Sequence, residues 1–87
     1  RDFPWTKSDA MNVLQKLEIL TRHGLFYRIT NQVISGLDSN NQPTYKTEYH
    51  VTIGNRGHEL FLSMDTTLSK AVNTAFEWAR ENKLLQL

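Results

Sequence analysis

Residues 45–64, YKTEYHVTIGNRGHELFLSM, decide the fold of this 87-residue chain. From Tyr45 to Ile53, apolar or aromatic residues largely alternate with polar ones. This period of two is typical of an antiparallel strand with one solvated face, because successive side chains of a strand point to opposite sides. The positions predicted to face the core are Tyr45, Tyr49, Val51 and Ile53.

A second strand returns beside this one. Residues 54–57, GNRG, combine two glycines with an asparagine and predict a tight turn. The segment 58–64 again carries an apolar residue at every second position, which predicts a strand that forms an antiparallel hairpin with the first. The residues expected to face inward are Leu60, Leu62 and Met64.

A third strand is predicted upstream, at residues 25–33, where the odd-numbered positions form the more apolar face. That face consists of Leu25, Tyr27, Ile29 and Val33. Residues 36–43, GLDSNNQP, are dense in turn-forming residues and predict a long hairpin loop before the next strand. Two hairpins in series give a three-stranded antiparallel meander.

Apolar residues at helical spacing precede and follow the predicted strands along the chain. Apolar residues recur every three or four positions within 8–23, with Ser8 as the predicted N-cap and Gly24 after the last turn. The charged residues of this helix are expected to lie on its other faces: Lys16, Glu18 and Arg22. A last helix follows a cap at Asp65, Thr66 or Thr67. Its apolar positions are Leu68, Ala71, Val72, Ala75, Phe76 and Ala79.

These elements predict an α+β fold of the order α-β-β-β-α, in which two helices pack on one face of a three-stranded antiparallel sheet. We expect an N-terminal arm at residues 1–7, the domain at residues 8–83 and a C-terminal tail at residues 84–87 that folds back over the last helix.

Because successive helical residues turn by about 100°, Phe76 and Trp78 cannot both lie on the inward stripe of the last helix. One of these aromatics is therefore expected at the edge of the core.

The composition is that of an ordinary globular domain, with 39% hydrophobic and 22% charged residues. The apolar runs are far shorter than the roughly 20 residues that cross a bilayer, and no signal peptide is visible. We therefore expect no membrane contact and an intracellular location, cytoplasmic or nuclear. Because the chain begins at Arg1, we expect it to be part of a larger protein. Its net charge of +1 permits nucleic-acid binding without requiring it.

Few residue patterns in this chain suggest chemistry. It has no cysteine, which excludes disulfides and thiolate metal sites. The 3 histidines lack metal-ligand spacing, and Glu59 and Asp65 have no accompanying nucleophile or phosphate-binding loop. We therefore expect a non-catalytic domain without a metal or cofactor.

With this order of elements, the chain resembles a double-stranded-RNA-binding domain over residues 8–83. The resemblance rests on the element order, on YHVTIG at residues 49–54 and on small residues in the last helix: Ala71, Ala75 and Ala79. It implies that the domain recognises duplex RNA by its shape and phosphates, through three regions of the fold. The residues at these regions are Asn12, Gln15 and Lys16 in the first helix, Asn40, Asn41 and Gln42 in the first hairpin loop, and Lys70 in the last helix.

Two alternatives remain open. When the family's small residues are aligned on the last helix, its lysine positions fall on Leu68, Ser69 and Val72. The same fold could therefore bind a protein partner or a second copy through an apolar patch of Leu68, Val72 and Trp78. The lesser alternative is a DNA-binding domain that lays its sheet in the major groove with Arg28, Lys46 and His50.

Overall fold

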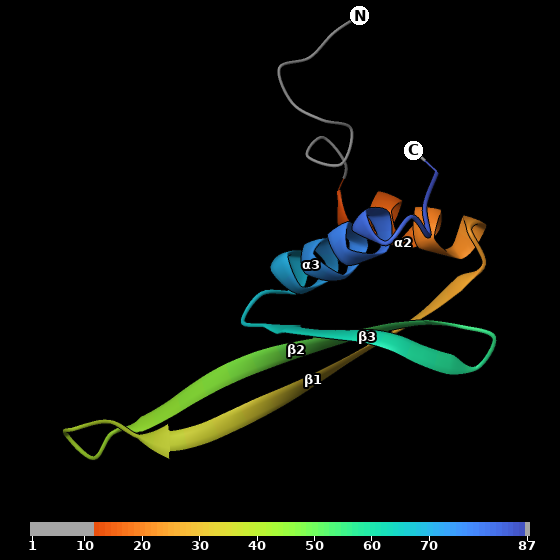
Figure 1. The fold of residues 1–87 in the computed structure, drawn as a ribbon. Helices are drawn as coiled ribbons and strands as arrows, with labels where there is room; N and C mark the ends of the chain where they lie inside the picture. The colour runs from red at the N-terminus through yellow and green to blue at the C-terminus, as the bar shows by residue number, and fades with distance from the viewer. Residues whose placement is uncertain (1–11, 87) are drawn as a thin grey trace, which may run out of the picture.

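The computed structural model describes residues 12–86, which form two helices and three strands. In chain order these are α2 (Val13–Arg22), β1 (Leu25–Leu37), β2 (Pro43–Asn55), β3 (His58–Asp65) and α3 (Leu68–Glu81). The strands form one antiparallel sheet in the order β1-β2-β3, and both helices lie on the same face of it (Figure 1). The predicted α+β fold and its element order are therefore confirmed. The predicted N-terminal arm and the cap at Ser8 lie outside the described residues.

Helix α2 begins later than the sequence predicted. Asn12 has an extended backbone, and its Oδ1 accepts a hydrogen bond from Gln15 N at 2.9 Å. In return, Gln15 Oε1 accepts from Asn12 N at 3.0 Å, which completes a capping box. A continuous helix over residues 8–23 is therefore wrong, because the extended residue 12 interrupts it. The predicted end is confirmed, since Gly24 follows the helix with a φ of +79°.

The first hairpin is longer than predicted. β1 and β2 pair over 13 residues each, and the loop between them shrinks to residues 38–42. Strands of this length reach about 43 Å, whereas α2 and α3, with 10 and 14 residues, reach only about 15 and 21 Å. The helices therefore cover only the part of the sheet that lies away from the first hairpin loop, which we call the covered half. Residues 31–46, which we call the hairpin arm, project beyond the helices and are exposed throughout (Figure 1).

Two residues predicted to face the core lie in the hairpin arm. Val33 is 61% exposed and Tyr45 is 74% exposed. Their register places them on the predicted side of the sheet, the side that carries the helices. The prediction that they are buried is wrong because neither helix is long enough to reach them.

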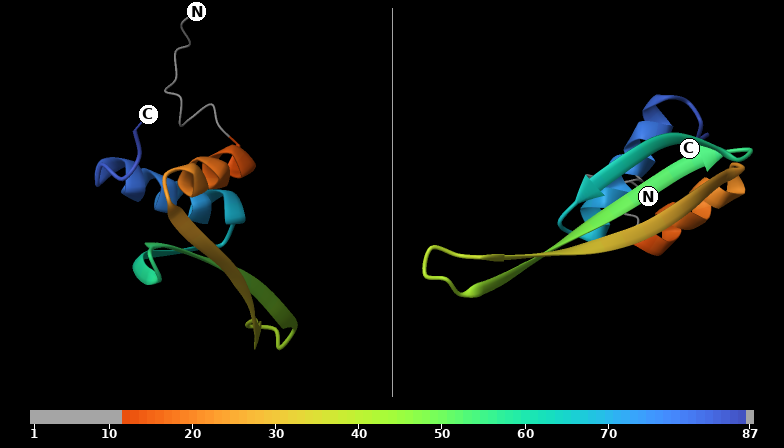
Figure 2. Two further views of the ribbon diagram at one scale, coloured as in Figure 1. Left: turned by 90° about the vertical axis from the view of Figure 1, so that its right-hand side faces the viewer. Right: turned by 90° about the horizontal axis from the view of Figure 1, so that it is seen from below.

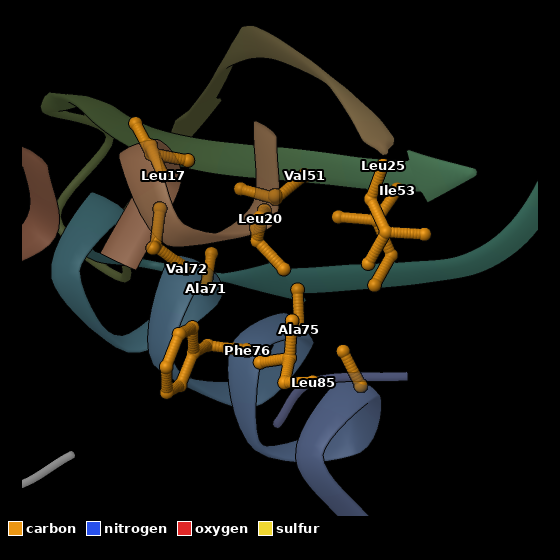
Figure 3. Close-up of a cluster of buried hydrophobic side chains, with 11 residues drawn as sticks. Leu17, Leu20, Leu25, Val51, Ile53, Ala71, Val72, Ala75, Phe76 and Leu85 are labelled. Atoms are coloured by element: carbon orange, nitrogen blue, oxygen red, sulfur yellow. The ribbon is translucent and has the colours of Figure 1, made fainter. Parts of the chain in front are cut away.

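The core lies between the two helices and the covered half of the sheet (Figure 3). Its buried apolar residues are Leu17, Leu20, Leu25, Val51, Ile53, Ala71, Val72, Ala75, Phe76, Ala79 and Leu85. The tail closes this core, as predicted, because Leu85 is buried and Gln86 N donates a hydrogen bond to His23 Nε2 at 3.2 Å. His23 Nδ1 in turn lies 2.8 Å from Ile19 O, so the same ring joins the end of α2 to the tail.

Strand β3 presents the opposite face to the core from the one predicted. Its three predicted core residues point away from the helices, 43%, 50% and 60% exposed: Leu60, Leu62 and Met64. In the register, Phe61 opposes Ile53 and Ser63 opposes Val51. Both β2 residues are buried against the helices, and directly opposed residues share a face of a sheet. Phe61 and Ser63 must therefore face the helices as well.

Helix α3 places its two aromatics as predicted, one inside and one at the edge. Phe76 is fully buried, whereas Trp78 is half-buried and stacks on Phe61, with ring centroids 4.8 Å apart. This stack fixes Phe61 on the inner face of the sheet. On the same face, Ser63 Oγ donates a hydrogen bond to Ala71 O at 2.6 Å, so α3 is joined to β3 at two levels.

Candidate functional site

The three regions that the resemblance assigns to RNA contact lie toward one end of the molecule. Helix α2 runs toward the base of the first hairpin, β1 runs back to its tip, and β3 runs in the same direction as β1 (Figure 1, Figure 2). The starts of both helices and the hairpin loop therefore point to the end that carries the hairpin arm. We call this the arm end.

The hairpin loop is held by Asp38. Its Oδ1 accepts hydrogen bonds from Asn40 N at 2.8 Å and from Gln42 N at 2.9 Å, and its own backbone N donates to Gln42 O at 3.0 Å. Asn41 adopts a positive φ of 58°, which asparagine tolerates better than most residues. The three predicted contact residues of this loop are all exposed at the tip of the arm.

The predicted RNA-contact residues in and just before α2 make most of their contacts within the domain. The side chains of Asn12 and Gln15 form the capping box. Lys16 is only 8% exposed, and its Nζ donates to Asn73 Oδ1 at 2.6 Å and lies 5.8 Å from the centroid of the Phe76 ring. The prediction that Lys16 lies on a solvent-facing side of its helix is therefore wrong. Because α3 packs across α2 at this point, the ammonium joins the two helices.

At the start of α3, one lysine is exposed and the apolar residues turn inward. Lys70 is exposed, and its backbone N donates to the capping Thr67 Oγ1 at 3.3 Å. Leu68 and Trp78 are half-buried against the core, and Val72 is fully buried. The prediction of an apolar surface patch that includes Val72 is therefore wrong, because this residue lies on the stripe of α3 that faces the sheet.

The arm end carries little positive charge. Among residues 12–86, its exposed lysines are Lys46 and Lys70, and they share this end with the carboxylates of Asp38, Glu48 and Asp65. Three arginines form surface ion pairs away from the arm: Arg22–Glu18, Arg28–Glu59 and Arg80–Glu77. A phosphate backbone at the arm end would thus meet as many carboxylates as ammonium groups, or more.

The sheet face opposite to the helices, which the DNA-binding alternative would use, also balances its charges. Arg28 pairs with Glu59, and His50 Nε2 lies 3.2 Å from Glu48 Oε1. Lys46 is exposed on the same side of the sheet, farther along the arm. The exposed leucines of β3 lie beside these pairs, so this face has neither the charge nor the polarity of a typical DNA-binding surface.

An exposed apolar strip on the hairpin arm is the feature that the sequence did not show as a surface. It consists of Val33, Leu37 and Tyr45, which are 61%, 67% and 74% exposed. The pairs Val33↔Thr47, Ser35↔Tyr45 and Leu37↔Pro43 place all three on the side of the sheet that carries the helices. Comparing the length of the alternating segments with that of the helices could have identified it.

A shallow groove runs beside α2, next to the start of β1. Its lining, which we call the α2 groove, consists of Leu14, Leu17, Glu18, Thr21, Arg22 and Tyr27. Leu14 is 75% exposed and Tyr27 is 42% exposed. The charges on its rim are paired, because Arg22 and Glu18 lie 2.7 Å apart. The groove therefore offers an apolar floor without a net charge.

Residues 12–86 contain no group of three or more His, Cys, Asp or Glu side chains arranged to hold a metal ion. Neither described helix has the length and apolar character that a bilayer-crossing helix needs. In comparisons with protein-family models, curated proteins and solved structures, nothing matches this chain.

Proposed function

We propose that this chain is a non-catalytic protein-interaction domain built on a scaffold of double-stranded-RNA-binding type, and that the hairpin arm is its contact surface. The observation that carries the proposal is the apolar strip of Val33, Leu37 and Tyr45, exposed on one face of an unsupported two-stranded arm. An isolated hairpin is only marginally stable in water, and exposed apolar patches mark interaction sites. A protein surface that covers the strip would stabilise the arm.

The scaffold assignment is supported by the packing of α3. Ala71, Ala75 and Ala79 are all fully buried, as expected for the small residues with which the resembled family packs its last helix on its sheet. The same alignment places the family's lysine positions on residues that turn inward here, since Leu68 is half-buried and Val72 fully buried. The packing of the last helix thus fits the resembled family, while the surface that would bind phosphate is not basic.

Duplex-RNA binding is the second candidate. It is favoured by one arrangement: the exposed loop at 40–42 and Lys70, in the first turn of α3, lie toward the same end of the molecule, although the length of the arm separates them. Under this reading Lys46 and Lys70 would contact phosphates, while Lys16 would act only through the packing of α2 on α3. The small number of exposed lysines predicts weak binding, because each lost phosphate contact removes a released counterion.

A titration of the 87-residue chain with an RNA duplex of about 16 base pairs, at about 50 and 200 mM salt, separates the two candidates. We expect no saturable binding below about 100 µM at either salt concentration. Micromolar binding that weakens steeply with salt, and that Lys70→Glu reduces but the matched charge change Lys83→Glu does not, would refute the protein-interaction proposal.

Photocrosslinking tests the proposed surface directly. A photoreactive residue is placed at Val33 in the arm, and in a control variant at Glu81, at the far end of α3. In cells that produce the protein, we expect protein adducts from position 33, none from position 81, and loss of the adducts when Tyr45→Lys is added. Adducts that form equally from both positions, or that survive this substitution, would contradict a specific contact through the apolar strip.

A further inference from the structure

Strand β1 has a free edge along the whole hairpin arm. The strand order is β1-β2-β3, so β1 pairs on one side only, with β2. Residues 31–37 of β1 are all exposed, and neither helix extends over them (Figure 1). Within residues 12–86, the backbone groups that this part of β1 turns away from β2 therefore have no strand to pair with.

The turn at the tip of the arm shows which backbone groups these are. In an antiparallel pair, opposed residues alternately exchange both of their backbone hydrogen bonds and none. Asp38 N donates to Gln42 O at 3.0 Å, whereas Pro43, the partner of Leu37 in the register, has no N–H to exchange. The register runs along the whole of β1 without a shift, so the even-numbered residues bond to β2. The odd-numbered residues turn their N–H and C=O groups to the free edge: Asn31, Val33, Ser35 and Leu37.

This edge lacks the devices with which proteins block edge strands. Such strands normally carry charged side chains, a proline or a bulge. Residues 29–37, ITNQVISGL, contain neither a charge nor a proline, and their register with β2 is unbroken. The other edge strand, β3, is shorter, carries Glu59 and Asp65, and shifts its pairing at Ile53/Gly54. The edge of the arm is therefore the one that is open to a further strand.

We propose that the arm binds an extended segment of another protein by β-strand addition, in which the segment pairs antiparallel with residues 31–37. The inference rests on the proposed function and deepens it, because it names the conformation and the chemistry of the partner. Val33 and Leu37 supply backbone groups at the edge and also carry exposed side chains of the apolar strip, so one added strand meets both. The arm is twisted, so that β1 and β2 cross in Figure 2, and an added strand follows the same twist.

The charges of the arm specify what this segment carries. The charged side chains nearest to the open edge are Arg28, which is paired with Glu59, and Asp38 at the tip. A charged side chain of the segment beside the strip would lose water without gaining a counter-ion. The segment is therefore uncharged where it pairs, with apolar side chains at every second position. Because antiparallel pairing starts the segment at the tip, a basic residue at its N-terminal end would meet the carboxylate of Asp38.

The first test is amide hydrogen exchange, residue by residue, with a synthetic peptide as the probe. The probe has about seven residues, a lysine followed by alternating valine and threonine, with both ends blocked. In the chain alone, the even-numbered amides of the arm should exchange more slowly than the odd-numbered ones. With the probe at about 1 mM, the odd-numbered amides should slow by at least about threefold. The same peptide with methylated valine nitrogens cannot pair with the edge and is the matched control.

Proline substitutions test the same edge in the protein. Ser35→Pro removes an N–H group that points to the free edge, so the hairpin should stay folded by circular dichroism while probe binding weakens about tenfold. Ser35→Thr keeps the N–H group and should bind the probe as the unchanged chain does. Gly36→Pro removes an N–H group that bonds to β2, and should therefore disrupt the arm itself.

The outcomes separate this inference from the proposed function. Arm-dependent crosslinks to another protein that survive Ser35→Pro overturn strand addition and leave the interaction proposal standing. Equal effects of the two peptides on the odd-numbered amides overturn it as well. Protection of these amides that rises with the concentration of the chain alone would assign the edge to a second copy and overturn the choice of partner. A chain that gives neither crosslinks from position 33 nor protection by the probe removes both proposals.

Discussion

The covered half of the sheet and the hairpin arm are made of the same two strands, yet only one of them belongs to the core. Val51 and Ile53 are fully buried, whereas Tyr45, on the same face of the same strand, is 74% exposed. Alternation along a strand decides which face a residue takes. The reach of the helices decides whether that face is covered, because they are less than half as long as the strands. A binding surface can thus arise where a strand pattern continues beyond its helices.

The largest expected effect on stability comes from the core, between the helices and the covered half of the sheet. Phe76 is the largest fully buried side chain, and its ring centroid lies 5.8 Å from Lys16 Nζ of α2. We expect Phe76→Ala to lower the free energy of unfolding by about 3–5 kcal/mol, because it removes a buried ring and leaves a cavity. Urea denaturation followed by circular dichroism measures this change. A loss below about 1 kcal/mol would mean that the helices do not depend on this contact.

A pair of glycines extends the comparison to the backbone. A Cβ at Gly54, in the covered half, would collide with His58 O and with the Phe26 ring, whereas a Cβ at Gly36, in the arm, would lie 3.5 Å from Thr44 Oγ1 in ordinary contact. We expect Gly54→Ala to cost about 3 kcal/mol, because a backbone carbonyl cannot move aside cheaply. Gly36→Ala is the matched control and should be neutral or stabilise slightly. Thermal melting of both variants measures the difference, and equal melting temperatures would contradict the expected collision.

The element order could be read from the sequence because each element carries its own local pattern. The alternation at residues 49–53 and the helical spacing of the alanines in α3 require no knowledge of the rest of the chain. The start of α2 was misplaced because Ser8 and Asn12 both satisfy the capping rule. Asn12 is distinguished by the reciprocal bond to Gln15, which completes the capping box.

The errors beyond this point all depend on tertiary contacts. The inward face of β3 follows from the stacking of Phe61 on Trp78, which a pattern within β3 does not reveal. The burial of Lys16 depends on how α3 crosses α2. The candidate surface was missed for a similar reason. The sequence correctly placed Tyr45 on the helix side of the sheet, but only the relative lengths of helices and strands show that nothing covers it.

A smaller effect on stability is expected where α2 and α3 meet above the covered half of the sheet. The Lys16 side chain is largely buried, and its ammonium donates to Asn73 Oδ1 at 2.6 Å. We expect Asn73→Ala to cost about 1 kcal/mol, because it leaves a partly buried charge without this acceptor. Lys16→Met keeps the apolar stem and removes the charge, so adding it to Asn73→Ala should recover most of the loss. Denaturant titration of the two single variants and the double variant checks this, and additive losses would contradict a pairwise contact.

The smallest effect is expected in the arm. Tyr45→Ala should change the unfolding free energy of the monomer by less than about 0.5 kcal/mol, because Tyr45 contributes nothing to the core. Amide hydrogen exchange gives the matching dynamic comparison. At low concentration the amides of residues 31–37 should exchange far faster than those of 51–53, because a two-stranded arm opens without unfolding the core. Equal protection in a dilute monomer would show that the arm is stabilised from within, and that its exposed strip needs no partner to hold it together.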